Sequence, residues 1–196
     1  MKVVIIKYNA GNIFSVDYGL KRIGIEAEIT GDINKIRNAD KVIFPGVGEA
    51  STTMNYLREH QLDKLIVSLK QPVFGICIGM QLLCSHSEEG NTDCLGVFEE
   101  KVMKFSPQDA VMKVPHMGWN TIQHKNNPLF KGLSQQDYVY YVHSYYATVG
   151  KDTVATTEYI HPFSAALQKD NFYAVQFHPE KSGAIGEKIL KNFIEL

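Results

Sequence analysis

Residues 73–83 read VFGICIGMQLL, an apolar run in which Cys77 lies midway between Gly75 and Gly79. Its first part, 73–76, is rich in β-branched and aromatic residues and predicts a strand, whereas the residues after Gly79 favour a helix. Such a junction needs glycines, because the residue between them takes a strained backbone conformation with its neighbours packed close. The run therefore predicts a strand, a tight turn at Cys77 and a helix.

The segments before this run repeat the alternation of strand and helix. Strands are predicted at residues 3–6, 27–29 and 42–44, and helices at residues 13–23 and 50–68. The strand segments are apolar throughout, which is typical of a parallel sheet covered by helices on both faces.

The character of the sequence changes after residue 96, where segments typical of strands replace the helical patterns. They cover residues 96–105, 119–123, 138–146, 153–157, 165–168 and 172–177. Only residues 183–196, with apolar side chains on one stripe, predict a further helix. We expect an α/β fold in one domain, 1–196, whose open, mostly parallel sheet is extended by antiparallel strands. Ligands are expected at the carboxyl ends of the parallel strands.

The composition is that of an ordinary globular domain: 196 residues, 44% hydrophobic and 21% charged, with a formal net charge of -1. Only three arginines and no dense basic run are present, which disfavours nucleic acid as a ligand. The longest apolar stretch, 72–83, is too short to cross a bilayer, and the N-terminus lacks a signal-peptide pattern. We therefore expect a cytoplasmic protein. The three cysteines lack CxxC spacing, which argues against a disulfide framework and a zinc site.

Cys77 has the sequence context of a reactive thiol. A cysteine in a Gly-x-Cys-x-Gly turn between strand and helix lies at a helix N-terminus, where free N–H groups favour the thiolate. The amide of Ile78 is then free to stabilise an oxyanion. The alternative interpretation is a buried structural cysteine, which is how we interpret Cys84 and Cys94.

A thiol nucleophile needs a base, and His178 is the candidate among seven histidines. It directly follows the strand predicted at 172–177, so we expect it at the same sheet edge as Cys77. Pro179 biases its backbone toward an extended conformation, and Glu180, two residues on, can reach back to orient the imidazole. Cys77, His178 and Glu180 thus fill the roles of nucleophile, base and orienting acid. His-Pro-Glu by itself is equally typical of a capped turn.

The second oxyanion donor is expected from the loop PGVG at residues 45–48, which follows one predicted strand and precedes a helix. Residues 46–51, GVGEAS, are also a near miss to the dinucleotide-binding fingerprint. Ser51 replaces its third glycine, and no acidic residue ends a strand about 20 residues further on, which disfavours a nucleotide cofactor.

The chain resembles the class I (triad) glutamine amidotransferases over nearly its whole length. The resemblance rests on the tight turn between strand and helix at Cys77, here called the elbow, on the loop at 45–48 and on HPE at 178–180. Further segments are similar to the glutaminase subunits of imidazole glycerol phosphate synthases: AGN at 10–12, GMQ at 79–81, SEE at 87–89, PHMGWN at 115–120 and HSYY at 143–146. One departure is YNAG at 8–11, where the family commonly has Tyr-Gly followed by a small residue and Gly. Because Asn tolerates a left-handed backbone, we expect the turn to survive.

The resemblance implies a three-layer α/β fold and a glutaminase reaction. In that reaction Cys77 attacks the side-chain amide of glutamine, His178 transfers protons and Glu180 holds His178. A thioester forms and is hydrolysed to glutamate after ammonia has left. The resemblance also implies an oxyanion hole at Val47, Gly48 and Ile78, and substrate binding by Gln81, Glu89, Ser144 and Tyr145. It implies neither a cofactor nor a metal ion.

The resemblance further implies a heterodimer with a cyclase subunit. In the family, the cyclase uses the ammonia to convert a phosphoribosyl-formimino intermediate of histidine biosynthesis to imidazole glycerol phosphate and an aminoimidazole carboxamide ribotide. Trp119 and Lys181 are expected at the interface. The amide of Val47 is expected to be turned away until the partner and its ligand bind, so that the isolated chain is nearly inactive. For the five tyrosines between residues 138 and 146, the core of a sheet is the favoured interpretation.

Three alternatives remain open on the sequence alone. The nearest is a glutaminase that feeds ammonia to amino-sugar biosynthesis with a different partner. A cysteine hydrolase or protease on the same sheet would need an open cleft instead of a pocket for one amino acid. A non-catalytic binding module would retain the fold without turnover.

Overall fold

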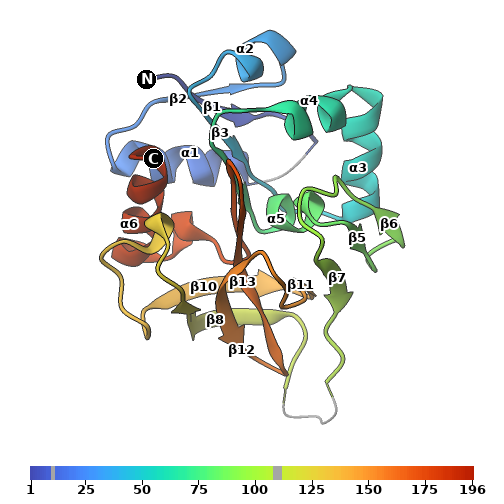
Figure 1. Ribbon diagram of the computed structural model, residues 1–196, viewed down its shortest axis with the longest axis vertical. Helices are drawn as coiled ribbons and strands as arrows, with labels where there is room; N and C mark the ends of the chain where they lie inside the picture. The colour runs from blue at the N-terminus through green and yellow to red at the C-terminus, as the bar shows by residue number, and fades with distance from the viewer. Residues whose placement is uncertain (10–11, 108–111) are drawn as a thin grey trace.

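An eight-stranded sheet forms the centre of the protein in the computed structural model, which describes residues 1–9, 12–107 and 112–196 (Figure 1). Five mutually parallel strands come first: β2 (Ala27–Thr30), β1 (Val3–Ile6), β3 (Lys41–Phe44), β4 (Val73–Ile76) and β14 (Phe172–Val175). Three antiparallel strands complete it: β13 (Pro162–Lys169), β12 (Thr153–Glu158) and β9 (Gln123–His124). The predicted parallel sheet with an antiparallel extension is confirmed. Ala10 and Gly11, which belong to two of the sequence motifs, lie outside the described residues.

Helices cover both faces of this sheet, because successive side chains of a strand point to opposite sides. On one face, Val4 and Ile6 of β1 share a buried cluster with residues of three helices: α3 (Ala50–Glu59), α4 (Leu62–Ser68) and α5 (Ile78–Leu83). On the other face, Val3 and Ile5 share a cluster with residues of α1 (Ile13–Arg22) and α6 (Gly183–Ile194). Figure 1 shows these two groups of helices on opposite sides of the central strands. The predicted three-layer α/β architecture is therefore confirmed.

Two short features are absent from the prediction. One is α2 (Ile33–Arg37), whose five residues are too few to display a periodic apolar stripe. The other is the pair of two-residue strands β5 (His86–Ser87) and β6 (Thr92–Asp93). Within the described ranges, no helix has both the length and the apolar character needed to cross a bilayer.

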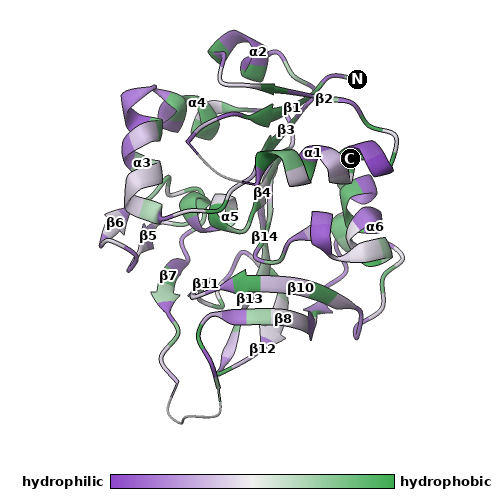
Figure 2. Ribbon diagram, turned by 180° about the vertical axis from the view of Figure 1, so that it is seen from behind, coloured by the Kyte–Doolittle hydropathy of each residue, from purple (hydrophilic) through white to green (hydrophobic). Residues whose placement is uncertain are grey.

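The strands of the second half do not all join the central sheet. β8 (His116–Thr121) pairs with β10 (Tyr138–His143) in an antiparallel ribbon, and Figure 2 shows the two lying side by side below the central strands. β7 (Lys101–Lys104) forms another small sheet with β11 (Tyr145–Ala147), β5 and β6. The antiparallel extension of the central sheet is therefore limited to β13, β12 and β9, and the remaining strands of the second half form these two smaller sheets. Each strand of the ribbon buries mainly one side, as an antiparallel pair with one face toward water can do.

The tyrosines of β10 show this one-sided burial. Tyr141 is completely buried, whereas 57% of Tyr138 is exposed. The interpretation of Tyr138 as sheet core is therefore wrong, because the alternation of the strand turns it to the outer face.

Candidate active site

Cys77 occupies a strained turn between β4 and α5. Its backbone has φ of 54° and ψ of -108°, a conformation that costs a non-glycine residue on the order of 1–3 kcal/mol. The glycines on either side allow the close packing that holds it. A Cβ at Gly79 would lie 2.0 Å from the carbonyl oxygen of Phe44, and one at Gly75 would lie 2.8 Å from Leu83 Cδ1. The predicted strained turn is present, and Cys77 is only 7% exposed.

His178 reaches the same sheet edge because β14 runs parallel to β4 and pairs Val175 with Ile76. Its backbone N–H donates to the carbonyl oxygen of Tyr140 at 2.9 Å. Its ring Nδ1 lies 2.8 Å from Glu180 Oε1, and both side chains are completely buried. The short 3-10 turn η2 (Pro179–Lys181) brings the carboxylate back to the ring.

The charges around His178 favour its protonated form. Burial lowers the pKa of the imidazole, but the Cys77 sulfur and the Glu180 carboxylate more than compensate, and the pKa rises from 6.5 to about 10. Ring atom Nε2 is buried and has no well-formed hydrogen-bond partner among the described residues. An imidazolium next to sulfur is the neighbour that a thiolate nucleophile requires. The structure thus brings the three predicted triad side chains together.

Helix α1 holds Glu180 from the other side. Asn12 Nδ2 donates to Glu180 Oε1 at 2.7 Å, and Arg22 Nη2 donates to the Glu180 carbonyl oxygen at 2.8 Å. Gly19 permits this approach, since a Cβ there would lie 2.9 Å from Glu180 Cβ. Sequence reasoning missed the contact between Asn12 and Glu180, because 168 positions separate the two residues.

The loop at 45–48 packs directly against the elbow. A Cβ at Gly46 would lie 2.2 Å from Ile78 Cγ2 and 2.0 Å from the Tyr8 hydroxyl. Tyr8 is buried and its hydroxyl donates to the carbonyl oxygen of Pro45. Burial, followed by the nearby Cys77, raises the pKa of this phenol. Of the predicted oxyanion residues, Ile78 directly follows the nucleophile and meets this loop at Gly46, while Val47 is half-buried and Gly48 is exposed. Tyr8 was missed as a neighbour of the site.

Gln81 lies one turn of helix after Cys77 and is only 3% exposed. Its Nε2 donates to the carbonyl oxygen of Tyr145 and to Gln176 Oε1, both at 2.9 Å, so its own Oε1 remains to accept a hydrogen bond. Gln176 Nε2 in turn donates to Cys77 Sγ at 3.6 Å. Gln176 is fully buried, and its contact with the nucleophile was not predicted.

Glu89 and Tyr145 lie on one rim of the site. Glu89 Oε2 accepts from the backbone N–H of Ala50, the first residue of α3, at 2.8 Å. Burial raises the pKa of this carboxyl. Burial and then the charge of Glu89 raise the pKa of the Tyr145 phenol, which indicates that the two are neighbours. The carbonyl of Ser144 accepts from Phe105 N–H at 3.0 Å.

Comparison with known proteins agrees with this geometry. The model of the family described as glutamine amidotransferase class-I matches residues 5–196. The chain belongs to the class-I glutamine amidotransferases. This membership accounts for a cysteine elbow, a histidine and a glutamate at one edge of a mostly parallel sheet.

Relatives of this amidotransferase carry a more specific name. The imidazole glycerol phosphate synthase subunit HisH of Bacteroides thetaiotaomicron is 63% identical over 196 residues, which cover 100% of both chains. The subunit of the same name from Escherichia coli is 47% identical over 198 aligned positions, again covering 100% of both chains. A crystal structure of a glutamine amidotransferase superposes with a TM-score of 0.75 over 100% of this chain and 98% of the other, at 19% identity, and shows the shared fold.

Two residues predicted for a partner interface lie outside the triad cluster of this amidotransferase. Trp119 on β8 is 55% exposed, and its ring meets that of Tyr140 edge-on at a centroid distance of 5.9 Å. Lys181 is exposed at the end of η2. The backbone carbonyl of Tyr140 also accepts the His178 backbone N–H, so Tyr140 connects Trp119 with the backbone of the triad histidine.

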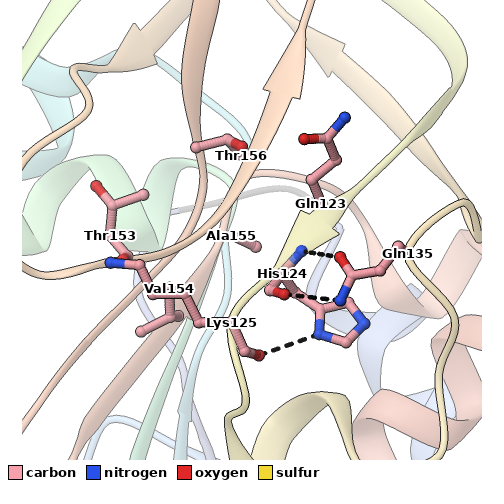
Figure 3. A pocket seen from close by; sticks show the side chains of 8 residues that line it. All are labelled: Gln123, His124, Lys125, Gln135, Thr153, Val154, Ala155 and Thr156. Atoms are coloured by element: carbon pink, nitrogen blue, oxygen red, sulfur yellow. Dashed lines mark hydrogen bonds between the residues drawn. The ribbon is translucent and has the colours of Figure 1, made fainter.

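A cavity of about 280 Å³ at the edge of the central sheet is unrelated to this chemistry (Figure 3). Its lining consists of Gln123, His124, Lys125, Gln135, Thr153, Val154, Ala155 and Thr156. The side-chain amide of Gln135 pairs with the backbone of His124, at 2.8 and 2.9 Å. The lining lacks a thiol and includes none of the predicted site residues.

Proposed function

We propose that this chain is the glutaminase subunit of an imidazole glycerol phosphate synthase, which hydrolyses glutamine to glutamate and ammonia for a cyclase partner. The observation that carries the proposal is its end-to-end match, at 63% identity, to a subunit of that enzyme. The arrangement of Cys77, His178 and Glu180 supplies the chemistry.

The first half-reaction forms a thioester. Cys77 Sγ attacks the carboxamide carbon of glutamine, and the carbonyl oxygen becomes an oxyanion. The N–H of Ile78 and the amides of Val47 and Gly48 stabilise that charge. His178, protonated next to the sulfur, gives its proton to the leaving nitrogen, so that ammonia departs and the acyl group stays on sulfur.

The second half-reaction restores the enzyme. His178, now neutral, takes a proton from water as the water oxygen attacks the thioester carbon. The carbon–sulfur bond breaks, glutamate leaves, and the thiolate–imidazolium pair forms again. Glu180 contacts Nδ1 at 2.8 Å, which fixes the ring orientation and stabilises its positive charge in both steps.

The polar end of glutamine has two candidate acceptors for its ammonium group. Glu89 offers a carboxylate on the rim, and Gln81 offers Oε1 after both of its N–H groups are used internally. Backbone groups at Ser144 and Tyr145 border the same space and complete the proposed binding site.

The partner is a cyclase subunit bound as a heterodimer, with Trp119 and Lys181 at the interface. Exposed Trp residues on an outer strand are typical of binding hot spots. If the amide of Val47 is turned away until the partner binds, one oxyanion donor is missing, at a cost of about 3 kcal/mol or a rate factor on the order of 10² to 10³. The isolated chain is therefore nearly inactive.

A glutaminase assay tests this function. Ammonia release is measured for the chain alone, with an imidazole glycerol phosphate cyclase, and with that cyclase and its nucleotide substrate. Strong stimulation by the pair, absent for Cys77→Ala, is the expected result. Equal activity with and without the cyclase would contradict the gating. Cys77 is also treated with a diazo-ketone analogue of glutamine and with peptide-like reagents. Labelling only by the peptide-like reagents would favour a cysteine hydrolase. Stimulation only by an amino-sugar synthase partner would place the chain with the amino-sugar glutaminases.

A further inference from the structure

Two buried histidines link the β8–β10 ribbon to the interior of the protein. His116 on β8 and His143 on β10 are paired across the two strands, and they are 3% and 6% exposed. His116 Nδ1 lies 3.0 Å from His143 Nε2. Neither ring has a role in the glutaminase steps above, yet both are placed in a cluster of aromatic rings around Phe105.

The hydrogen bonds at the two ends of this pair determine which atoms carry protons. At one end, Asn120 Oδ1 accepts the backbone N–H of Thr121, so Nδ2 donates, both to the Glu158 carbonyl at 2.9 Å and to His116 Nε2 at 3.4 Å. At the other end, the carbonyl of Tyr145 can only accept, so His143 Nδ1, at 2.7 Å, must donate to it. Both rings must then be neutral and protonated on Nδ1.

The surroundings agree with neutral rings. Burial lowers the pKa of His116 from 6.5 to about 4. Burial also lowers the pKa of His143 from 6.5 to about 3; the hydrogen bond to the Tyr145 carbonyl opposes this shift, and His116 and His178 add to it. A positively charged His178 nearby is therefore compatible with His143 only while His143 is uncharged.

The chain of donors continues from Tyr145 to the nucleophile. The Tyr145 carbonyl uses both lone pairs, because it also accepts from Gln81 Nε2 at 2.9 Å. The second N–H of Gln81 donates to Gln176 Oε1, which orients the Gln176 amide so that Nε2 donates to Cys77 Sγ at 3.6 Å. Each hydrogen bond fixes the orientation of the next polar group, as expected of a fully satisfied buried network.

We propose that His116 and His143 are positioning residues of the glutaminase reaction, which act through Tyr145, Gln81 and Gln176 to aim a hydrogen-bond donor at the Cys77 sulfur. This inference rests on the proposed function for its role in turnover, but the arrangement of donors does not. An apolar ring would fill the space around Phe105 equally well, whereas only a neutral histidine with its proton on Nδ1 both accepts from His116 and donates to Tyr145.

The first test needs no variant. Nitrogen NMR of the full chain labelled with 15N on histidine rings reports which ring nitrogen carries the proton. The expected result is that His116 and His143 are both neutral at pH 7 and protonated on Nδ1. A protonated Nε2 on either ring would overturn the proposal.

The second test measures the rate at which iodoacetamide alkylates Cys77, followed by mass spectrometry of its peptide. His143→Leu removes the donor to Tyr145 and should slow both alkylation and kcat by about fivefold to tenfold, the factor that one lost hydrogen bond carries. His143→Asn keeps an amide N–H near the position of Nδ1 and should restore most of both rates. The matched control is His161→Phe. His161 contacts Phe105 and Tyr146 in the same aromatic cluster, but it is not one of the groups in the hydrogen-bond series that leads from His116 to Cys77.

Coupling is tested in a double-mutant cycle with Gln176→Met, which removes the donor to sulfur. If the histidines act through Gln176, His143→Leu has little further effect on alkylation in that background. The proposal would be overturned if the effects of His143→Leu and Gln176→Met on the alkylation rate multiply in the double variant. It would also be overturned if His161→Phe slows alkylation as much as His143→Leu, or if His143→Asn does not restore the rate. Because alkylation requires no glutamine, a failed glutaminase assay of the wild-type chain would contradict the proposed function separately.

Discussion

Replacing Glu180 by Gln tests the electrostatics of the site with almost no change in shape. His178 Nδ1 and Asn12 Nδ2 both donate to Glu180 Oε1, at 2.8 and 2.7 Å. The amide of Glu180→Gln must therefore place its carbonyl oxygen at that position. Its NH₂ group then occupies the position of Oε2, which is buried and has no hydrogen-bond partner in the described part of the chain.

Two costs follow from that geometry. A hydrogen bond to a charged group stabilises by about 1.5–3 kcal/mol and a neutral one by about 0.5–1.5, so the imidazolium loses about 1.4 kcal/mol. That loss lowers the pKa of His178 by about one unit and kcat by roughly tenfold. The buried NH₂ group without an acceptor lowers the free energy of unfolding by about 1–3 kcal/mol.

The assay combines an NMR titration of the His178 ring, kcat in the complex with the cyclase, and urea unfolding. Glu195→Gln is the matched control, because it removes an exposed carboxylate that pairs with Lys191 at 3.8 Å and has no contact with the triad. That control should change neither the titration nor kcat. A Glu180→Gln protein with the wild-type titration midpoint and wild-type kcat would refute the role assigned to the carboxylate.

Three further outcomes are expected. Gly79→Ala places a Cβ 2.0 Å from the Phe44 carbonyl oxygen and should lower the free energy of unfolding by about 3 kcal/mol in urea titrations; an unchanged midpoint would contradict the packing of the elbow. Because the folded-state pKa of His143, about 3, is below its unfolded value of 6.5, its contribution to stability is complete above pH 6.5 and is lost as the pH falls. By pH 5 the wild type should lose about 2 kcal/mol more than His143→Asn, as measured by urea unfolding at pH 7 and 5, and parallel losses would disprove the assignment. Trp119→Ala, at a side chain that is 55% exposed, should leave the stability of the isolated chain within about 0.5 kcal/mol and weaken cyclase binding about 30-fold by calorimetry. Unchanged affinity would exclude Trp119 from the interface.

The local part of the site was accessible from the sequence. The turn at Cys77 follows from the glycines at 75 and 79 next to an apolar strand, and the approach of Glu180 to His178 follows from a spacing of two residues. Both features depend on neighbours in the chain, so periodicity and turn chemistry are sufficient to predict them.

The second half of the chain was less accessible. Alternating patterns identified its strands but not their partners, so the separate β8–β10 ribbon was not predicted and Tyr138 was assigned to a core. An antiparallel ribbon with one face toward water has the same alternation as a strand added to a large sheet. The pattern therefore indicates which side of a strand is buried, but not which element of the fold covers that side.

The sequence by itself determined the strand–turn–helix at the nucleophile, the succession of elements, and which side chains are apolar enough to be buried. Only the tertiary structure decided which distant polar groups meet: Asn12 with Glu180, and Gln176 with Cys77. The physical reason is the separation along the sequence of the residues that interact. Hydrophobic periodicity records how one segment faces the core, whereas a hydrogen bond across about a hundred positions or more exists only after packing has placed β14 beside β4 and α1 over η2.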